Sequence, residues 1–390
     1  MSRPAVEVAD LLRKQGDRFM GQSPWLSFQQ LSVLRAITRC RTAALGGHID
    51  QCSQCGHQAI SYNSCRNRHC PKCQAQARQR WLAAREKELL GVPYFHVVFT
   101  LPHELNGLCL RNARILYDLL FRASAAAMLE VAANPERLGA RIGFISILHT
   151  WGQNLLLHPH VHCVVPAGGL SADQKRWIHP KYAFFLPVVA LGVVFRGKFV
   201  DGLRKAYRQG KLHFSGSTAE LGNPKRFAAF VDTLFRQKWV VYAKPAFGGP
   251  TQVLRYLGRY THRVAISNHR LLAFDGEHVT FRWKDYAHGN KQRKMTLSAT
   301  EFLRRFTQHV LPRGFVRIRQ FGFLANTRRS ALLALARQLL TATPKAPQTC
   351  APDAPNSSAW RCPHCNGEMR IGPNLPAWQL ASRCRPLDSS

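Results

Sequence analysis

Three Cys-x2-Cys pairs constrain what this chain can fold into more than any other feature of its sequence. Cys52–Cys55 and Cys70–Cys73 lie close together, and a third pair lies near the end of the chain. A two-residue gap lets both sulfurs of a pair face one point, and two such pairs complete a tetrahedral zinc site with Zn–S distances of about 2.3 Å. We therefore expect Cys52, Cys55, Cys70 and Cys73 to bind structural zinc in a small, separate N-terminal domain.

Further candidate ligands surround these two pairs. Cys65 and His69 lie within the cluster, and Cys40 and His48 precede it. These four residues are enough to bind a second zinc ion. They could instead replace some ligands of the first ion, and spacing alone does not decide between these possibilities.

The third pair, Cys362–Cys365, is half of another zinc site, for which Cys350 and Cys384 are candidate partners. The long gaps between these cysteines make this the weaker motif.

Basic residues lie among the N-terminal cysteines, namely Arg66, Arg68 and Lys72. Such side chains commonly contact phosphate, so we expect the zinc module to face phosphate groups of a partner. The alternative is a solvated basic loop.

The charge balance indicates a polyanionic partner. The 390 residues include 55 Lys and Arg against 21 Asp and Glu, a formal net charge of +34. The acidic residues of the chain are too few to neutralise this excess, which implies a polyanionic partner. Nucleic acid is the commonest partner of this kind. A merely basic protein is the alternative. The spread of charge along the chain favours an extended DNA-binding surface over a disordered basic arm.

The apolar stretches exclude a membrane partner. The longest spans residues 182–195 and is interrupted by Pro187, too short to cross a bilayer core of about 30 Å. The first ten residues lack the apolar segment of a secretory signal. We therefore expect an intracellular protein whose twelve cysteines bind metal or stay buried as thiols rather than form disulfides.

Hydrophobic periodicity predicts an α+β fold with three parts. The predicted helices span 5–45, 74–90, 112–134, 224–240, 250–262 and 299–311, and the predicted strands span 94–100, 143–149, 160–166, 279–283 and 295–297. The expected domains are 5–92, helical and zinc-binding; 93–325, catalytic; and 326–390, a C-terminal helix, a linker and the third cysteine pair.

Three histidines alternate in the string His158-Pro-His160-Val-His162. On a strand they would point to one face, where His160 and His162 could hold a divalent metal ion. The third ligand could be His158 or His149, or a residue on a facing helix. A metal here would polarise a phosphate, and Mg²⁺ or Mn²⁺ would suit that chemistry.

Two tyrosines, Tyr256 and Tyr260, stand four residues apart, which places them on one face of a helix. Arg255, Arg259 and Arg263 flank them and could stabilise a phenolate and contact DNA. Taken alone, the pair favours amphipathic tyrosines in a core or interface. Because the histidines and the positive charge occur in the same chain, we predict that the tyrosines are nucleophiles.

Taken together, these strings resemble the rolling-circle transposases of the insertion sequence 91 family, which are HUH endonucleases (U denotes an apolar residue). The resemblance extends over nearly the whole chain. It is carried by Cys-Arg-Asn-Arg-His-Cys-Pro-Lys-Cys at 65–73, Phe-Thr-Leu-Pro-His at 99–103, the histidines at 158–162, Tyr-Leu-Gly-Arg-Tyr-Thr-His-Arg at 256–263 and Phe-Arg-Trp-Lys-Asp-Tyr at 281–286.

The resemblance implies an HUH-type antiparallel sheet flanked by helices. It implies that a tyrosine attacks single-stranded DNA and becomes linked to the 5′ phosphate, and that a second tyrosine permits rejoining. By position, Tyr256 and Tyr260 match the nucleophiles, and His160 and His162 match the metal pair. The implied partners are single-stranded DNA at the ends of a mobile element and target DNA. The implied location is the bacterial cytoplasm, on the nucleoid when DNA is bound.

Other classes of protein explain part of the sequence. A plasmid replication initiator or a conjugative relaxase would use the same chemistry. A zinc-dependent DNA-binding protein without catalysis leaves the histidines without a role. A three-histidine metallohydrolase leaves the tyrosines and the charge unexplained.

Overall fold

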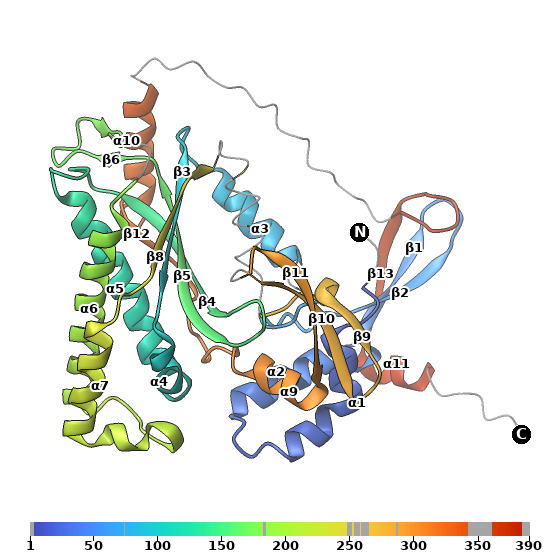
Figure 1. Cartoon of the computed structure of the whole chain (residues 1–390). Coiled ribbons are helices and arrows are strands. Elements are labelled where there is room, and N and C mark those ends of the chain that lie inside the picture. The colour runs from blue at the N-terminus through green and yellow to red at the C-terminus, as the bar shows by residue number, and fades with distance from the viewer. Residues whose placement is uncertain are drawn as a thin grey trace, which may run out of the picture.

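The computed structural model describes residues 4–73, 75–181, 185–247, 252, 258, 265–285, 288–341 and 361–383. It combines helices with antiparallel sheets (Figure 1), so the α+β class predicted from the sequence is confirmed. Among the described residues, no helix combines the length and the apolar character that crossing a bilayer requires.

A five-stranded antiparallel sheet forms the centre of the larger part of the molecule. Its order is β12-β4-β5-β3-β8. The strands are β3 (Tyr94–Thr100), β4 (Gly143–Trp151), β5 (Leu157–Pro166), β8 (Val241–Phe247) and β12 (Ile318–Gly322). Three of the five predicted strands, 94–100, 143–149 and 160–166, are its three central members, because their runs of β-branched and aromatic residues suit a pleated, buried surface. The two edge strands lack so regular a pattern.

The two faces of this sheet are covered by different helices (Figure 1). Along β5, Val161, Cys163 and Val165 belong to the core that lies against the first set of helices, whereas Val164 belongs to a second core on the opposite face. Successive side chains of a strand alternate faces, so His160 and His162 lie on the same face as Val164. The first set of helices is α4 (Asn106–Arg111), α5 (Ala113–Ala133), α6 (Val188–Arg208) and α7 (Pro224–Arg236), and the opposite set is α3 (Ala75–Glu86) and α10 (Arg329–Thr341).

A separate hydrophobic core joins the N-terminal helices to a later part of the chain. Val8, Leu11 and Leu34 pack with Phe281 and Phe302. Residues assigned by sequence to 5–92 and 93–325 thus share one core. Its elements are α1 (Val8–Gly21), α2 (Phe28–Thr38), β9 (Leu271–Phe274), β10 (His278–Asp285), β11 (Lys291–Ser298) and α9 (Ala299–Thr307).

A third sheet joins the two ends of the chain. Its order is β13-β1-β2, in which β1 (Gly47–Cys52) pairs antiparallel with both β2 (Gln58–Tyr62) and β13 (Met369–Leu375). Figure 1 shows β13 beside β1 and β2, with α11 (Ala377–Arg383) next to them. The remaining elements are the short strands β6 (Gly169–Leu170) and β7 (Trp177–Ile178) and the 3-10 helices η1 (Ala43–Leu45), η2 (His103–Leu105), η3 (Gly216–Gly222) and η4 (Asn268–Arg270).

Candidate functional site

Three histidines from neighbouring strands meet on the α3 and α10 face of the central sheet. His149 of β4 is the direct register partner of His160 on β5. One ring nitrogen each of His149, His160 and His162 lies within 4.8 Å of the others. The set brings together the predicted pair and one of the candidates for a third ligand.

Of the candidates for a third ligand, the geometry brings His149 to the predicted pair and leaves His158 outside the group. His158 is exposed and lies outside the group of converging ring nitrogens. Residues four apart on one strand are separated by about 13 Å along its axis, so His158 and His162 cannot readily share an ion. A residue directly opposite on the next strand is only about 5 Å away at Cβ, and His149 holds that place.

The protonation of His160 suits a metal ligand. Its Nδ1 lies 2.6 Å from the carbonyl oxygen of His158, which can only accept a hydrogen bond. Nδ1 therefore carries the hydrogen and Nε2 the lone pair. Burial lowers the pKa of His160 to about 4, and burial followed by the neighbouring imidazoles holds the pKa of His162 well below its ordinary value. Both rings are neutral at pH 7, as metal coordination requires.

His96 of β3 supports this set, and sequence reasoning missed it. Its Nε2 lies 2.8 Å from Nδ1 of His162, and the two rings stack with an interplanar angle of 5°. A bond from Nδ1 of His162 to His96 would leave Nε2 of His162 to bind a metal, the usual arrangement of a ligand histidine and its outer partner. The available signal was a histidine in a strand otherwise made of apolar residues, at 94–100.

A pocket of about 940 Å³ opens over the histidines. Besides them it is lined by Trp151, Tyr242, Lys244 and Arg304. Tyr242 and Lys244 are exposed on β8, and Tyr242 pairs with Val98. The guanidinium of Arg304 is held by the carboxylate of Glu301 at 2.6 and 2.9 Å. The pocket thus combines aromatic surface with positive charge beside the histidine set.

His309 ties α9 to the hairpin that carries the histidines. Its Nε2 donates to the carbonyl of Leu155 at 3.0 Å, and its Nδ1 lies 3.2 Å from the hydroxyl of Thr150. Burial lowers its pKa from 6.5 to about 4. A histidine whose pKa is depressed by folding stabilises the fold above its unfolded pKa, and that contribution is lost as pH falls through 6.5 towards 4.

We expect His309→Gln to flatten this part of the pH dependence of stability. Glutamine retains an amide donor but does not titrate. The free energy of unfolding of wild type should fall by up to about 3 kcal/mol on acidification because His309 becomes protonated, and the variant should lack this fall. Thermal unfolding midpoints between pH 7.5 and 4.5 measure it. The difference between wild type and variant should be largest at pH 7.5 and shrink towards pH 4.5; a difference independent of pH would contradict the assignment.

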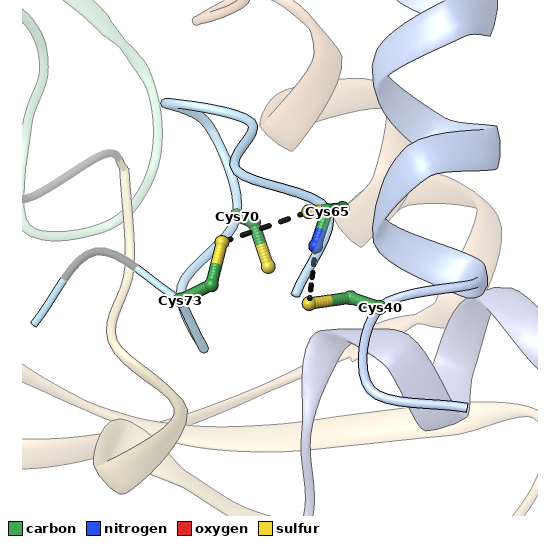
Figure 2. Close-up of side chains that lie close together, drawn as sticks. All are labelled: Cys40, Cys65, Cys70 and Cys73. Atoms are coloured by element: carbon green, nitrogen blue, oxygen red, sulfur yellow. Dashed lines mark hydrogen bonds between the residues drawn. The ribbon is translucent and has the colours of Figure 1, made fainter. Parts of the chain in front are cut away.

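Four cysteines form a compact cluster beside the N-terminal helices (Figure 2). The sulfurs of Cys40, Cys65, Cys70 and Cys73 lie within 4.8 Å of one another. Sγ of Cys65 is 3.6 Å from Sγ of Cys73, and the backbone N–H of Cys65 donates to Sγ of Cys40. Four converging thiols are the donor set of a structural zinc ion. Cys40 and Cys70 are almost fully buried and belong to the core that joins the N-terminal helices to β9–β11.

The predicted grouping of Cys52 and Cys55 with Cys70 and Cys73 is wrong. The sulfurs of Cys52 and Cys55 converge instead with those of Cys362–Cys365, the pair near the C-terminus. The spacing of each pair was interpreted correctly as a metal-binding turn, but equal spacings carry no information about which pairs meet. Cys350 and Cys384, the proposed partners of Cys362–Cys365, lie outside the described residues.

The two other histidines proposed near the zinc sites are engaged elsewhere. Nε2 of His69 accepts the backbone N–H of Leu311 at 3.0 Å, and its Nδ1 faces Oδ1 of Asn67 at 3.2 Å. His69 thus joins the cysteine loop to a distant segment rather than completing the thiol cluster. His48 lies 3.3 Å from the carboxylate of Asp50.

Of the basic residues within the cysteine loop, two have internal partners. Arg68 donates to the backbone carbonyls of Pro312 and Phe315, and Lys72 forms an ion pair of 2.6 Å with Glu7. These contacts hold the cysteine loop against the fold, and the expected contact of both residues with phosphate stays a prediction. Arg66 is exposed, and its contact with phosphate stays a prediction.

Tyr256, Tyr260, Arg255, Arg259 and Arg263 lie outside the described residues. Gly258, between the two tyrosines, is described: it is helical and buried. A Cβ built on it would lie 3.0 Å from Cδ1 of Leu82 in α3. The middle of the tyrosine motif therefore packs against the helix that covers the histidine face of the sheet.

Two family models match the chain. Residues 143–331 match the family described as "Putative transposase", and residues 11–101 match the "Transposase zinc-binding domain" of the IS91 type. The second range includes the whole cluster of Cys40, Cys65, Cys70 and Cys73.

Curated relatives cover most of the chain. The chain is 52% identical to "Putative transposase y4qJ" of Sinorhizobium fredii (strain NBRC 101917 / NGR234), over 89% of this chain and 87% of that protein. It is 30% identical to "Transposase for insertion sequence element IS801" of Pseudomonas savastanoi pv. phaseolicola, over 76% of this chain and 70% of that protein.

The similarity to solved structures is remote. The conjugative relaxase TrwC in complex with oriT DNA, metal-free, covers 43% of this chain and 71% of its own, with 14% identity and a TM-score of 0.23. The metal-bound structure of the same complex gives 14% identity over 43% of this chain and 70% of its own, with a TM-score of 0.21.

Proposed function

This chain belongs to the family of IS91- and IS801-type transposases, and from this premise we propose that it cleaves and rejoins single-stranded DNA through a 5′-phosphotyrosine intermediate. The observation that carries the proposal is the convergence of His149, His160 and His162 beneath a pocket with aromatic and basic walls. Such a site serves phosphate chemistry at the ends of a mobile element, in rolling-circle-type transposition.

The histidine set is proposed to hold one divalent metal ion. When bound, such an ion polarises the scissile phosphate and stabilises the charge that develops on its oxygens. The donors are three neutral imidazoles, and nitrogen ligands suit Mn²⁺ better than Mg²⁺, which prefers an all-oxygen shell. His160 and His162 would bind through Nε2, since Nδ1 of each is occupied by the carbonyl of His158 or by His96.

Tyr256 and Tyr260 are the proposed nucleophiles. The phenolic oxygen of one attacks the phosphorus, the bond from phosphorus to the 3′ oxygen breaks, and that oxygen takes up a proton to become a free 3′ hydroxyl. The tyrosine loses its own proton, so the exchange conserves atoms and charge. The packing of Gly258 on α3 supports the placement of this motif, because α3 covers the histidine face.

The pocket walls are proposed to hold the nucleotides beside the scissile phosphate. The ring of Tyr242 offers a stacking surface for a base, and base–aromatic stacking contributes about 1–3 kcal/mol per base. Lys244 lies two residues along the same strand and supplies charge for a phosphate oxygen. Arg255, Arg259, Arg263 and the exposed Arg66 are further proposed DNA contacts.

The covalent intermediate provides the test. The protein is incubated with a labelled single-stranded element end and Mn²⁺ or Mg²⁺, then denatured, and the label that migrates with protein is measured. Wild type is expected to form the adduct, and the double variant Tyr256→Phe, Tyr260→Phe to form none, because phenylalanine lacks the attacking oxygen.

Tyr242→Phe is the matched control. It removes a hydroxyl from the same pocket but keeps the aromatic ring, so the adduct should persist. A double variant that still forms the adduct, or a wild type that never does, would refute the mechanism. If Tyr242→Phe alone abolished the adduct, the nucleophile would be Tyr242 on β8.

A further inference from the structure

The two ends of the chain each contribute one cysteine pair to a second thiol cluster. Sγ of Cys52 lies 3.4 Å from Sγ of Cys365, and Sγ of Cys55 lies 3.6 Å from Sγ of Cys362. We propose that these four residues bind one zinc ion, the terminal zinc site, which fastens residues 361–383 to the N-terminal region.

The two cysteine turns have the same backbone structure. In the first, the N–H of Cys52 donates to the carbonyl of His57 at 2.8 Å, and the N–H of Gly56 donates to the carbonyl of Cys52 at 3.2 Å. The second turn has the same two bonds at the same spacings. The N–H of Cys362 donates to the carbonyl of Gly367 at 2.8 Å, and the N–H of Asn366 donates to the carbonyl of Cys362 at 2.9 Å.

The backbone angles of the two turns agree as well. The residue after the second cysteine is left-handed in each, with φ of 70° at Gly56 and 60° at Asn366. Glycine and asparagine are the residues that adopt this region most readily. Two segments of unrelated sequence therefore form the same turn, each with its sulfurs aimed at the other.

The sulfur positions fit a tetrahedral ion. Zn–S distances of about 2.3 Å place the sulfurs of a regular tetrahedron about 3.8 Å apart. All four sulfurs here lie within 4.8 Å of one another, and the two closest cross-pairs are at 3.4 and 3.6 Å. A disulfide needs about 2.05 Å, so these are separate thiols. A Cβ on Gly367 would lie 2.7 Å from Oε1 of Gln54 and 3.0 Å from Sγ of Cys52, so the two turns approach each other closely at this glycine.

Few apolar side chains surround the thiols themselves. The buried cluster around them comprises Cys52, Cys362 and Met369, with Ala59 partly buried against it, and Leu375 and Leu380 are buried further along the same segment. Structural metal is the usual supplement to so small an apolar cluster.

Zinc content of the full-length protein tests the terminal zinc site. Wild type purified under reducing conditions should contain two zinc ions per chain, and Cys362→Ser with Cys365→Ser should contain one. Cys109→Ala is the matched control, because Cys109 is buried outside both thiol clusters, and it should keep two. Two zinc ions in the double variant would overturn the proposal. A single zinc ion in both wild type and the double variant would overturn it as well.

A second measurement uses wild type alone and does not depend on the folding of a variant. Cys55 and Cys365 are exposed, so free thiols at these positions would react rapidly with N-ethylmaleimide. In zinc-loaded protein we expect both to react at least about tenfold more slowly than after zinc is removed by a strong chelator. Rapid alkylation of both in the zinc-loaded protein, mapped by peptide mass spectrometry, would refute the site.

Discussion

Replacing His162 with alanine is expected to lower the rate of covalent strand cleavage on the order of a thousandfold, with DNA binding largely retained. The proposed metal would lose a central ligand, and His96 would lose the ring to which it is bonded. His149→Ala and His160→Ala should have effects of similar size, because all three nitrogens converge on one point. Single-turnover cleavage of a labelled DNA end, with binding measured separately, provides the readout.

His158→Ala is the control for this series. It removes a histidine from the same strand and the same sequence motif but from outside the converging set. The backbone carbonyl that orients His160 remains, so cleavage should stay within a few-fold of wild type. If His158→Ala is as damaging as His160→Ala while His149→Ala is tolerated, the ligand set is His158, His160 and His162 after all.

Replacing Cys70 with serine is expected to lower the thermal unfolding midpoint by about 10 °C or more. Cys70 belongs both to the thiol cluster of Figure 2 and to the core that joins α1 and α2 to β10 and α9. Binding of structural zinc contributes on the order of 10 kcal/mol in small domains, and its loss here would loosen a core shared by both parts of the chain. Thermal unfolding with and without chelator measures the effect.

Cys109→Ala again gives the comparison. It removes a thiol that is equally buried but lies in the core of α4 to α7, where no metal is proposed. We expect the free energy of unfolding of this variant to fall by about 1 kcal/mol. Chelator should lower its thermal unfolding midpoint as much as it lowers that of wild type. If Cys70→Ser unfolds like Cys109→Ala and chelator has no effect on wild type, zinc does not stabilise this core.

Local pattern was enough to predict the strands that carry the histidines. The runs 94–100, 143–149 and 160–166 are rich in valine, isoleucine and phenylalanine, and such segments form buried strands in most contexts. Alternation then placed His160 and His162 on one face. The choice between His149 and His158 depended on the register between β4 and β5, and no local pattern encodes that register.

Contacts between residues far apart in the sequence could not be predicted from local pattern. Cys52–Cys55 could meet either of the other two pairs, and the nearer one in sequence was the wrong choice. Helix α6 was also missed, because its apolar residues begin as a continuous run, 188–195, without helical alternation. Arg68 illustrates the same limit: a basic residue in a loop suggests a phosphate contact, yet distant carbonyls of Pro312 and Phe315 accept its hydrogen bonds.

The sheet built from β1, β2 and β13 has a consequence for how the protein is made. Cys55 and its partner Cys362 are 307 residues apart. At synthesis rates of about 5–20 residues per second, the ribosome needs roughly 15–60 seconds to deliver the second pair after the first. During that time the edge of β1 that pairs with β13 has no partner strand, and Cys52 and Cys55 lack the other two ligands of the proposed zinc site. A premature stop codon upstream of Cys362 removes β13, so this sheet can be completed only on chains translated through Leu375.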